Sequence, residues 1–187
     1  MRAAIFYATR EGQAERVAQH IAIHLRAHNI LADVIDVKDL YGTIEWPAYN
    51  QAYVVASVHT GHHEKEMVRF VRRFKDELVE RHAPFLSLTL SQAGAEMPTS
   101  TLVQRETARR DALRMISDFM KDTGWRPAHV LPVAGALMYS KYNFLVKWIM
   151  KRIAHSAGFD GPPTRDYEFT NWPAVDRFVD RLTPAAA

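Results

Sequence analysis

Short apolar runs alternate along this chain with longer segments in which apolar residues recur every three or four positions. The runs lie at 3–8, 31–37, 52–56, 85–90 and 129–134, and polar or turn-forming residues bound each of them. Runs of this length predict buried strands, whereas the three-to-four spacing predicts helices that bury one face. The clearest helical set is Ala14, Val17, Ala18, Ile21, Ala22 and Leu25.

The helical spacing returns after the third and fourth runs and again near the end of the chain. It predicts further helices over 67–78, 107–121 and 175–182. Strands that alternate with helices predict a parallel sheet covered on both faces, and the continuous apolar strands agree with that. We therefore expect one doubly wound α/β domain, of five strands, that covers residues 1–187.

One segment does not fit this alternation, because residues 135–169 separate the last predicted strand from the last helix. Such a connection needs only a few residues, so we expect an insertion at about 136–168. Within it, 142–155 has apolar residues on one side of a predicted helix and basic residues on another, as in a helix that lies in a membrane interface. An ordinary packed helix with a solvated basic edge is the alternative. The residues expected to dock to a membrane or a substrate are Lys141, Lys147, Trp148, Lys151 and Arg152.

Composition narrows the possible functions. The chain has no cysteine, which excludes disulfides, thiolate metal sites and cysteine nucleophiles. The net charge is +3 and the pI about 9.2, which suits an anionic partner but is too weak a bias for a dedicated nucleic-acid binder. No apolar stretch approaches the roughly 20 residues of a membrane span, and no signal peptide is evident, so we expect a cytoplasmic protein.

The loop after the first predicted strand contains Thr9, Arg10, Glu11, Gly12, Gln13 and Ala14 and leads directly into a helix. Ligands of open α/β sheets bind beyond the carboxyl ends of the strands, and the amino end of a helix favours a phosphate. Two structural alternatives remain open: Thr9 as a simple helix cap and Gly12 as a simple turn. The loop matches neither the dinucleotide-binding glycine motif nor the P-loop.

Histidines occur in two groups that raise the question of a metal site. His59, His62 and His63 follow the third strand at a predicted helix start, where adjacent histidines generally face solvent or the edge of a ligand. His20, His24 and His28 form a stripe on the first helix, and we expect that stripe on the solvent side, because other residues occupy the apolar face. We therefore expect no metal.

The segment from Thr9 to Gln13 resembles the phosphate loop of flavodoxin-like proteins, in the variant of the menaquinone-dependent protoporphyrinogen oxidase family. The similarity extends over nearly the whole chain. It continues at Ala56-Ser57, Gly61-His62, Trp125-Arg126-Pro127, Ala134-Gly135-Ala136-Leu137, Tyr139, Tyr142 and Thr170-Asn171-Trp172. The resemblance implies a flavodoxin-like sheet of order 2-1-3-4-5, with FMN as the cofactor and activity at the cytoplasmic face of the membrane.

Two positions depart from the family pattern. The hydroxyl residue that usually closes the phosphate loop is Ala14 here, so one side-chain contact is lost while backbone donors remain. The segment 90–98 lacks the basic cluster expected of close family members, and arginines follow only at 105, 109 and 110. These departures bear on the identity of the substrate more than on flavin binding.

The resemblance also implies which residues contact the cofactor. They are Thr9, Arg10, Glu11, Gly12, Gln13, Ala14, Ser57, Val58, His59, Thr60, Gly61, Ser91, Gln92 and Ala93. His59 and His62 are candidates for contacts at the flavin edge, and Arg10 and Lys141 for contacts with an anion. No catalytic acid or base can be assigned.

The expected function is that of an FMN-dependent oxidoreductase. It would oxidise protoporphyrinogen IX, or another anionic small molecule of that type, and pass the electrons to a membrane quinone as a peripheral protein of the inner face of the cell membrane. The alternatives are a flavodoxin-like electron carrier without its own substrate and an interaction domain that has lost its flavin. No nucleic-acid partner is expected.

Overall fold

A parallel sheet forms the centre of the computed structural model, which describes residues 1–40, 42–141, 161–162 and 164–183. Its strands follow the order β2-β1-β3-β5-β6, with every neighbouring pair parallel. In chain order of the five parallel strands this is 2-1-3-4-5, which confirms the predicted topology. The strands are β1 (Arg2–Ala8), β2 (Leu31–Asp36), β3 (Gln51–His59), β5 (Phe85–Thr89) and β6 (Val130–Ala134).

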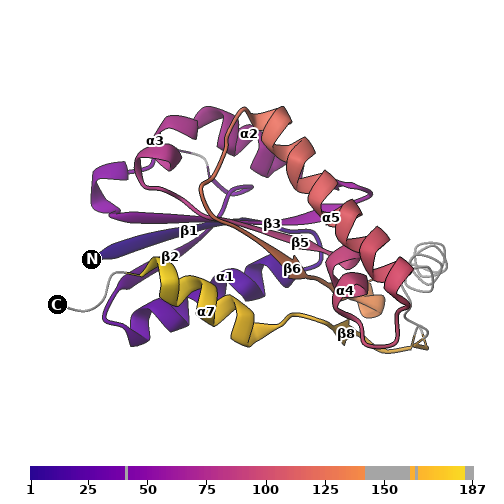
Figure 1. Cartoon of the computed structure of the whole chain (residues 1–187). Coiled ribbons are helices and arrows are strands. Elements are labelled where there is room, and N and C mark those ends of the chain that lie inside the picture. Colours follow the sequence, from indigo (N-terminus) through magenta and orange to yellow (C-terminus); the bar gives the residue numbers. More distant parts are fainter. Residues whose placement is uncertain (41, 142–160, 163, 184–187) are drawn as a thin grey trace.

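Helices cover both faces of the sheet (Figure 1). The helices α1 (Gln13–Ala27) and α7 (Trp172–Leu182) lie on one face, and α2 (Lys65–Arg73), α3 (Lys75–Glu80) and α5 (Leu102–Thr123) lie on the other. Successive residues of β1 alternate between the two resulting cores, because side chains of a strand point to opposite faces. Ile5 packs with α1 and α7, whereas Phe6 packs with α2 and α5.

Several boundaries differ from those predicted. β3 continues to His59, so Ser57, Val58 and His59 belong to a strand and not to a loop, and β4 (His62–His63) returns antiparallel to it. The expected helix over 67–78 is divided into α2 and α3 at Phe74.

The greatest difference follows β5, where a helix, α4 (Leu90–Glu96), takes the place of the expected loop. The side chain of Thr89 caps it by accepting a hydrogen bond from the backbone N–H of Gln92. α5 in turn begins five residues before the predicted start, at a capping box formed by Thr101 and Gln104.

The two ends of the inserted segment lie together. After β6 come β7 (Ala136–Leu137) and a 3₁₀ turn, η2 (Tyr139–Lys141), and β8 (Tyr167–Glu168) pairs antiparallel with β7. A second 3₁₀ turn, η1 (Trp46–Ala48), precedes β3. The predicted amphipathic helix falls in 142–160, outside the described residues, and so do Lys147, Trp148, Lys151 and Arg152. No helix among the described residues is long and apolar enough to cross a membrane.

Candidate functional site

A cavity of about 270 Å³ lies at the carboxyl ends of β1, β3 and β5. This is the edge of an open α/β sheet where ligands bind. Its walls come from the loop before α1, the β3–β4 hairpin, the start of α4 and the segment after β6. The lining residues are Thr9, Arg10, Glu11, Gln13, Ser57, Val58, His59, Thr60, Gly61, Glu64, Leu88, Thr89, Leu90, Ser91, Met115, Gly135 and Ala136.

The loop before α1 has the geometry of an anion site. Thr9 Oγ1 accepts a hydrogen bond from the Gly12 N–H at 2.9 Å, and Gly12 turns the chain with φ +97°. Thr9 and Gly12 therefore do close the turn, as the structural alternatives held. The turn leaves the first N–H groups of α1 without partners inside the helix, as at every helix start, and the helix dipole adds positive charge there. Such an end accepts a phosphate without any further side chain.

Lys38 adds a cation to this loop, which the sequence did not suggest. It follows β2, and its Nζ donates a hydrogen bond to the backbone carbonyl of Thr9. The contact joins residues 29 positions apart. It places positive charge beside the start of the phosphate loop and fixes the path of the backbone there.

Gln13 turns its side chain toward the protein. It is 5% exposed, and its amide nitrogen donates at 2.8 Å both to Glu168 Oε1 and to Thr170 Oγ1. Thr170 passes the connection on to the carbonyl of Ala134 at the end of β6. The phosphate loop is thus attached to the chain that returns from the insertion, and the Gln13 amide is committed to that role.

Arg10, in the loop before α1, pairs with a buried acid that follows β4. Its Nε lies 3.0 Å from both carboxylate oxygens of Glu64, with the hydrogen bond to Oε2. The Glu64 side chain is 1% exposed and that of Arg10 is 52% exposed. Oε1 of Glu64 has no hydrogen bond among the described residues. This oxygen is itself buried, and the Arg10 Nε at 3.0 Å compensates its charge.

The β3–β4 hairpin forms another wall. Its turn is built from Thr60 and Gly61, both in the left-handed region with φ +49° and +84°. A left-handed threonine is uncommon and strained, and such residues gather at functional sites. Ser57 Oγ donates to the carbonyl of Ala8 at 3.3 Å and so holds the hairpin against β1.

The three histidines of this hairpin do not converge. His59 lines the cavity, and His62 is exposed and outside the lining. His63 is buried in the core, 2.8 Å from Ser87 Oγ and in ring contact with Phe85 and Phe119. Burial, with a smaller contribution from His62, lowers the pKa of His63 to about 3, so the ring is neutral. The expectation that adjacent histidines here face solvent or a ligand was wrong for His63.

Ten of the fourteen predicted contact residues line the cavity, and four do not. Gly12 shapes the loop, and Ala14 is fully buried in the core beneath α1. The Gln92 amide donates a hydrogen bond to Glu96 on the surface of α4, and Ala93 of the same helix is buried. The segment after β5 was expected to flank a flavin ring. Of its predicted contact residues Ser91 lines the cavity, and Leu90 lines it as well.

Sequence reasoning missed the lining residues that come from outside the predicted loops. Glu64 and Met115 reach the cavity from a strand end and from the middle of a helix. Gly135 allows a close approach, because a Cβ there would lie 3.4 Å from the backbone of Thr89. Gly135 comes just after the fifth predicted strand, and ligands bind at the carboxyl ends of such strands, so its position could have indicated that it lines the site.

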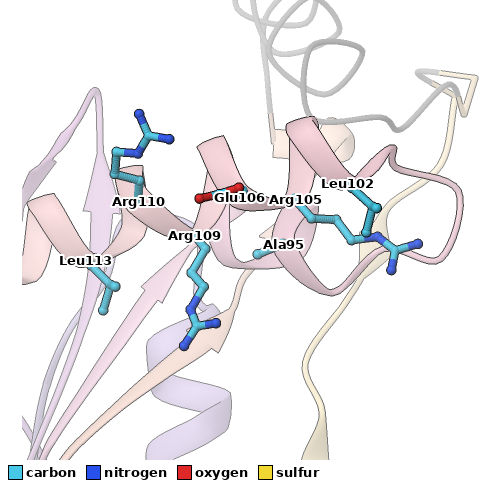
Figure 2. A pocket seen from close by; sticks show the side chains of 7 residues that line it. All are labelled: Ala95, Leu102, Arg105, Glu106, Arg109, Arg110 and Leu113. Atoms are coloured by element: carbon cyan, nitrogen blue, oxygen red, sulfur yellow. The ribbon is translucent and has the colours of Figure 1, made fainter.

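A second hollow, of about 720 Å³, lies on the outer side of α4 and α5 (Figure 2). In the figure, Arg109 and Leu113 extend on the same side of α5 and Arg110 on the other. Leu102 and Leu113 are exposed. Arg105 is held by the carbonyls of Pro98 and Ser100, whereas no ion pair engages Arg109 or Arg110 within the described part of the chain. The lining residues are Ala95, Leu102, Arg105, Glu106, Arg109, Arg110 and Leu113.

Comparisons with known proteins agree with this architecture. The model of the flavodoxin domain family matches residues 4–162. Protoporphyrinogen IX dehydrogenase [quinone] of Escherichia coli strain K12 is 26% identical over 182 residues, 97% of this chain and 94% of that protein. The protein of the same name from Leishmania major is 26% identical over 94% of this chain and 71% of its own length.

A solved structure shows the same fold. The short-chain flavodoxin associated with a non-canonical PDU bacterial microcompartment aligns with a TM-score of 0.53 at 14% identity, covering 100% of this chain and 99% of that one. The cofactor that a flavodoxin domain implies is a flavin, and the cavity lies at the sheet edge where such a domain binds its ligand. The chain belongs to the flavodoxin domain family.

Proposed function

We propose that this protein is an FMN-dependent oxidoreductase that oxidises protoporphyrinogen IX to protoporphyrin IX and delivers the electrons to a membrane quinone. The observation that carries the flavin part is the cavity at the carboxyl edge of the sheet, with a helix start on one wall and a strained hairpin on another. The substrate and the acceptor rest on the names of the relatives, which are 26% identical over nearly all of this chain.

The residues present fit a flavin mononucleotide. The N–H groups at the start of α1 and the nearby Lys38 would hold its phosphate. Apolar side chains of Val58, Leu90 and Met115 would cover a planar ring and keep water from it. When bound, the flavin supplies the redox chemistry, and the protein supplies orientation and charge.

The anionic substrate would approach from the side of α5. Met115 lines the flavin cavity, and Arg109 lies six positions before it, about 9 Å along the helix axis and about a third of a turn around it. Arg109 and Arg110 would attract the carboxylates of a porphyrinogen, while Leu102 and Leu113 offer apolar contact for its ring. Each two-electron oxidation of the porphyrinogen would reduce one quinone to quinol. The protons that the porphyrinogen releases would equal in number those that the quinone takes up.

The membrane part of the proposal rests on the sequence. The basic and aromatic residues Lys147, Trp148, Lys151 and Arg152 would bring the protein to an anionic bilayer that contains the quinone. Lys141, at the end of η2, would stand where the chain enters this segment. A peripheral position at the inner face of the cell membrane is the corresponding localisation.

The first experiment is the visible spectrum of the purified protein after incubation with FMN and desalting. A retained flavin band, with FMN identified after denaturation, supports the cofactor. Anaerobic oxidation of protoporphyrinogen with a quinone then tests the reaction. A protein that neither retains FMN nor quenches its fluorescence on titration overturns the whole proposal.

An electron carrier without its own substrate is the second candidate, because flavodoxin folds also serve that role. The basic composition counts against this candidate, because it suits an anionic substrate or bilayer better than the basic partner of an acidic carrier. Deletion of residues 138–166 distinguishes the two candidates. An enzyme that docks through this segment loses quinone-linked turnover while it keeps FMN, whereas a carrier keeps its electron transfer.

A further inference from the structure

Three histidines of α1 face two aspartates of α7 across the interface between these helices. His20 Nε2 lies 2.6 Å from Asp176 Oδ1, and His24 Nε2 lies 2.6 Å from Asp180 Oδ1. His28 Nε2 lies 3.7 Å from the same Asp180 oxygen. The expectation that this stripe lies on the solvent side holds for His28, which is exposed, but not for His20 and His24, which are partly covered because α7 packs along them. The sequence could not show this, since the partners are separated by more than 150 positions.

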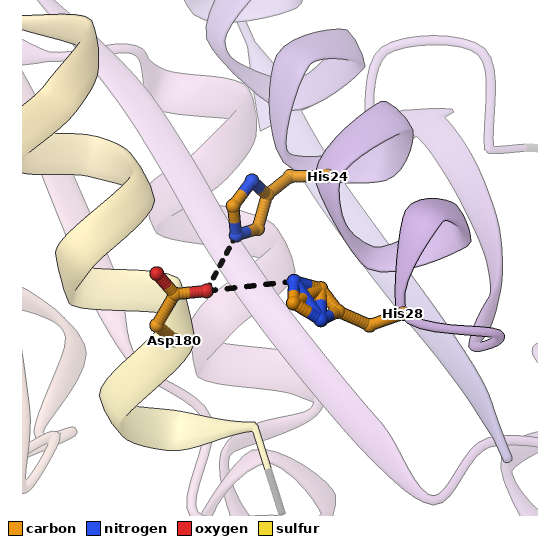
Figure 3. Close-up of side chains that lie close together, drawn as sticks. All are labelled: His24, His28 and Asp180. Atoms are coloured by element: carbon orange, nitrogen blue, oxygen red, sulfur yellow. Dashed lines mark hydrogen bonds and ion pairs between the residues drawn. The ribbon is translucent and has the colours of Figure 1, made fainter. Parts of the chain in front are cut away.

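Three of these side chains converge on one point (Figure 3). Ligand atoms of His24, His28 and Asp180 all lie within 4.8 Å of one another. Two imidazole nitrogens and a carboxylate oxygen are the donor set that Zn²⁺ and similar ions take from proteins, typically with water as the fourth ligand. His28 and Asp180 have side chains about half exposed, so water can reach the fourth position.

A fourth residue orients the central ligand. His24 Nδ1 lies 3.4 Å from Asp176 Oδ1, on the side of the ring opposite to Asp180. Nε2 lies at hydrogen-bond distance from Asp180 Oδ1, so a proton is shared between these two atoms. When an ion takes the place of that proton, the carboxylate at Nδ1 favours the tautomer protonated there and leaves the Nε2 lone pair for the ion. Histidine ligands of metal ions almost always have such a carboxylate or carbonyl partner on the second nitrogen. His20 holds Asp176 in turn.

We propose that His24, His28 and Asp180 bind a divalent transition-metal ion of the zinc type, with Asp176 orienting His24. The ion would join the last turn of α1 to the last turn of α7. His24 lies 11 positions after the start of α1, about 16 Å along the helix from the phosphate loop. The site is accordingly structural, and it is separate from the flavin cavity and from its chemistry.

The proposal predicts saturable binding of one Zn²⁺ ion per chain to protein that has been freed of metal and of any histidine tag. Isothermal titration with zinc chloride at pH 7.5 measures it. His28→Ala and Asp180→Asn should each weaken binding at least about tenfold, and Asp176→Asn by about tenfold or more through the orientation of His24. His129→Ala, which removes an exposed histidine outside the cluster, is the matched control and should bind as the parent does.

A second readout separates a metal site from a simple network of ion pairs. Zinc should raise the thermal midpoint of the parent and of His129→Ala, because it binds the folded chain. It should not raise the midpoint of His28→Ala or Asp180→Asn, whatever their midpoints are in EDTA. The proposal is overturned if the parent binds no zinc at 100-fold excess over protein, or if the cluster variants bind and respond as the control does.

Discussion

Arg10 and Glu64 connect the phosphate loop to the β3–β4 hairpin, with Arg10 Nε 3.0 Å from the carboxylate. The two walls of the flavin cavity that they join are 54 positions apart in the chain. Glu64 is buried and Arg10 is half exposed, so the negative charge lies in the protein and the compensating positive charge lies at its surface.

Removal of Arg10 should therefore cost more than removal of an ordinary surface arginine. Arg10→Ala leaves the buried carboxylate without its cation, and we expect a loss of about 1–3 kcal/mol in the free energy of unfolding. Arg69 pairs with Glu66 at 3.3 Å on the surface of α2 and is the matched control. Arg69→Ala should cost less than about 1 kcal/mol. Urea unfolding of the apoprotein measures both, and equal costs would contradict the role given to Glu64.

Gly12 is the position where the phosphate loop needs glycine. Its φ of +97° lies in the left-handed region, where a Cβ costs about 1–2 kcal/mol. Gly12→Ala should destabilise the protein and also weaken FMN, because relief of the strain moves the N–H groups at the start of α1. Gly42→Ala is the control, since nothing lies within 4 Å of the added Cβ and no left-handed φ is required there. Fluorescence titration of FMN gives the affinities, and unchanged binding in Gly12→Ala would contradict this view of the loop.

Gln13 provides a test of how the insertion is attached to the site. Gln13→Ala removes the donor to Glu168 and Thr170, and we expect a loss of about 1–3 kcal/mol because the partners remain part-buried. Gln92→Ala removes a hydrogen bond to Glu96 on the exposed surface of α4 and should cost under about 1 kcal/mol. Thermal and urea unfolding compare the two. A Gln13 variant as stable as the Gln92 variant would mean that water replaces the lost amide.

The sequence predicted the five parallel strands well, because strands buried on both faces form continuous apolar runs. Their order came from the resemblance to flavodoxin-like proteins. Sequence reasoning failed where local pattern carries no signal. The helix break at Phe74 contains neither proline nor glycine, and Phe74 is itself buried, so the spacing runs through it. α4 begins directly after β5, and its cap, Thr89, is the last residue of that strand.

The sequence predicted only the part of the candidate site that lies in loops at strand ends. The loop after β1 and the hairpin after β3 lie at strand ends, where topology alone indicates a ligand. Lys38 and Glu64 meet the phosphate loop over 29 and 54 positions. No local spacing encodes such contacts, and they could be found only once the order of the strands had placed their elements side by side.

His63 should make the stability of the fold depend on pH. Its pKa in the folded protein is about 3, below the ordinary value of 6.5, so the unfolded chain binds more protons between these values. Stability is therefore complete above pH 6.5 and falls as the pH decreases toward 3, by up to about 1.4 kcal/mol per pH unit. His63→Gln should remove this component from urea unfolding curves recorded between pH 7.5 and 4.5. His62→Gln, at the exposed neighbour, is the control and should keep the parent's dependence of stability on pH. If His63→Gln keeps it too, His63 is not its source.

The α5 arginines should govern how well a carboxylate substrate binds. Arg109 stands beside Leu113 on the face of the hollow, unpaired within the described residues, whereas Arg114 pairs with Asp111 at 3.3 Å. Arg109→Glu should raise the KM for protoporphyrinogen by about fivefold, since an exposed charge pair contributes up to about 1 kcal/mol. The affinity for FMN should not change, because Arg109 lines the second hollow and is not among the lining residues of the flavin cavity. Arg114→Glu is the matched control for net charge and should leave KM near that of the parent.

The dimethyl ester of the same substrate separates charge from shape. It keeps the porphyrinogen ring and removes both negative charges, so Arg109→Glu should lose its effect on KM when the ester is oxidised. An equal rise in KM for the acid and the ester would mean that the substitution disturbs the helix and not a carboxylate contact. No rise with either substrate would move the substrate away from α5 and toward the inserted segment, where the basic candidates are Lys141, Lys147, Lys151 and Arg152.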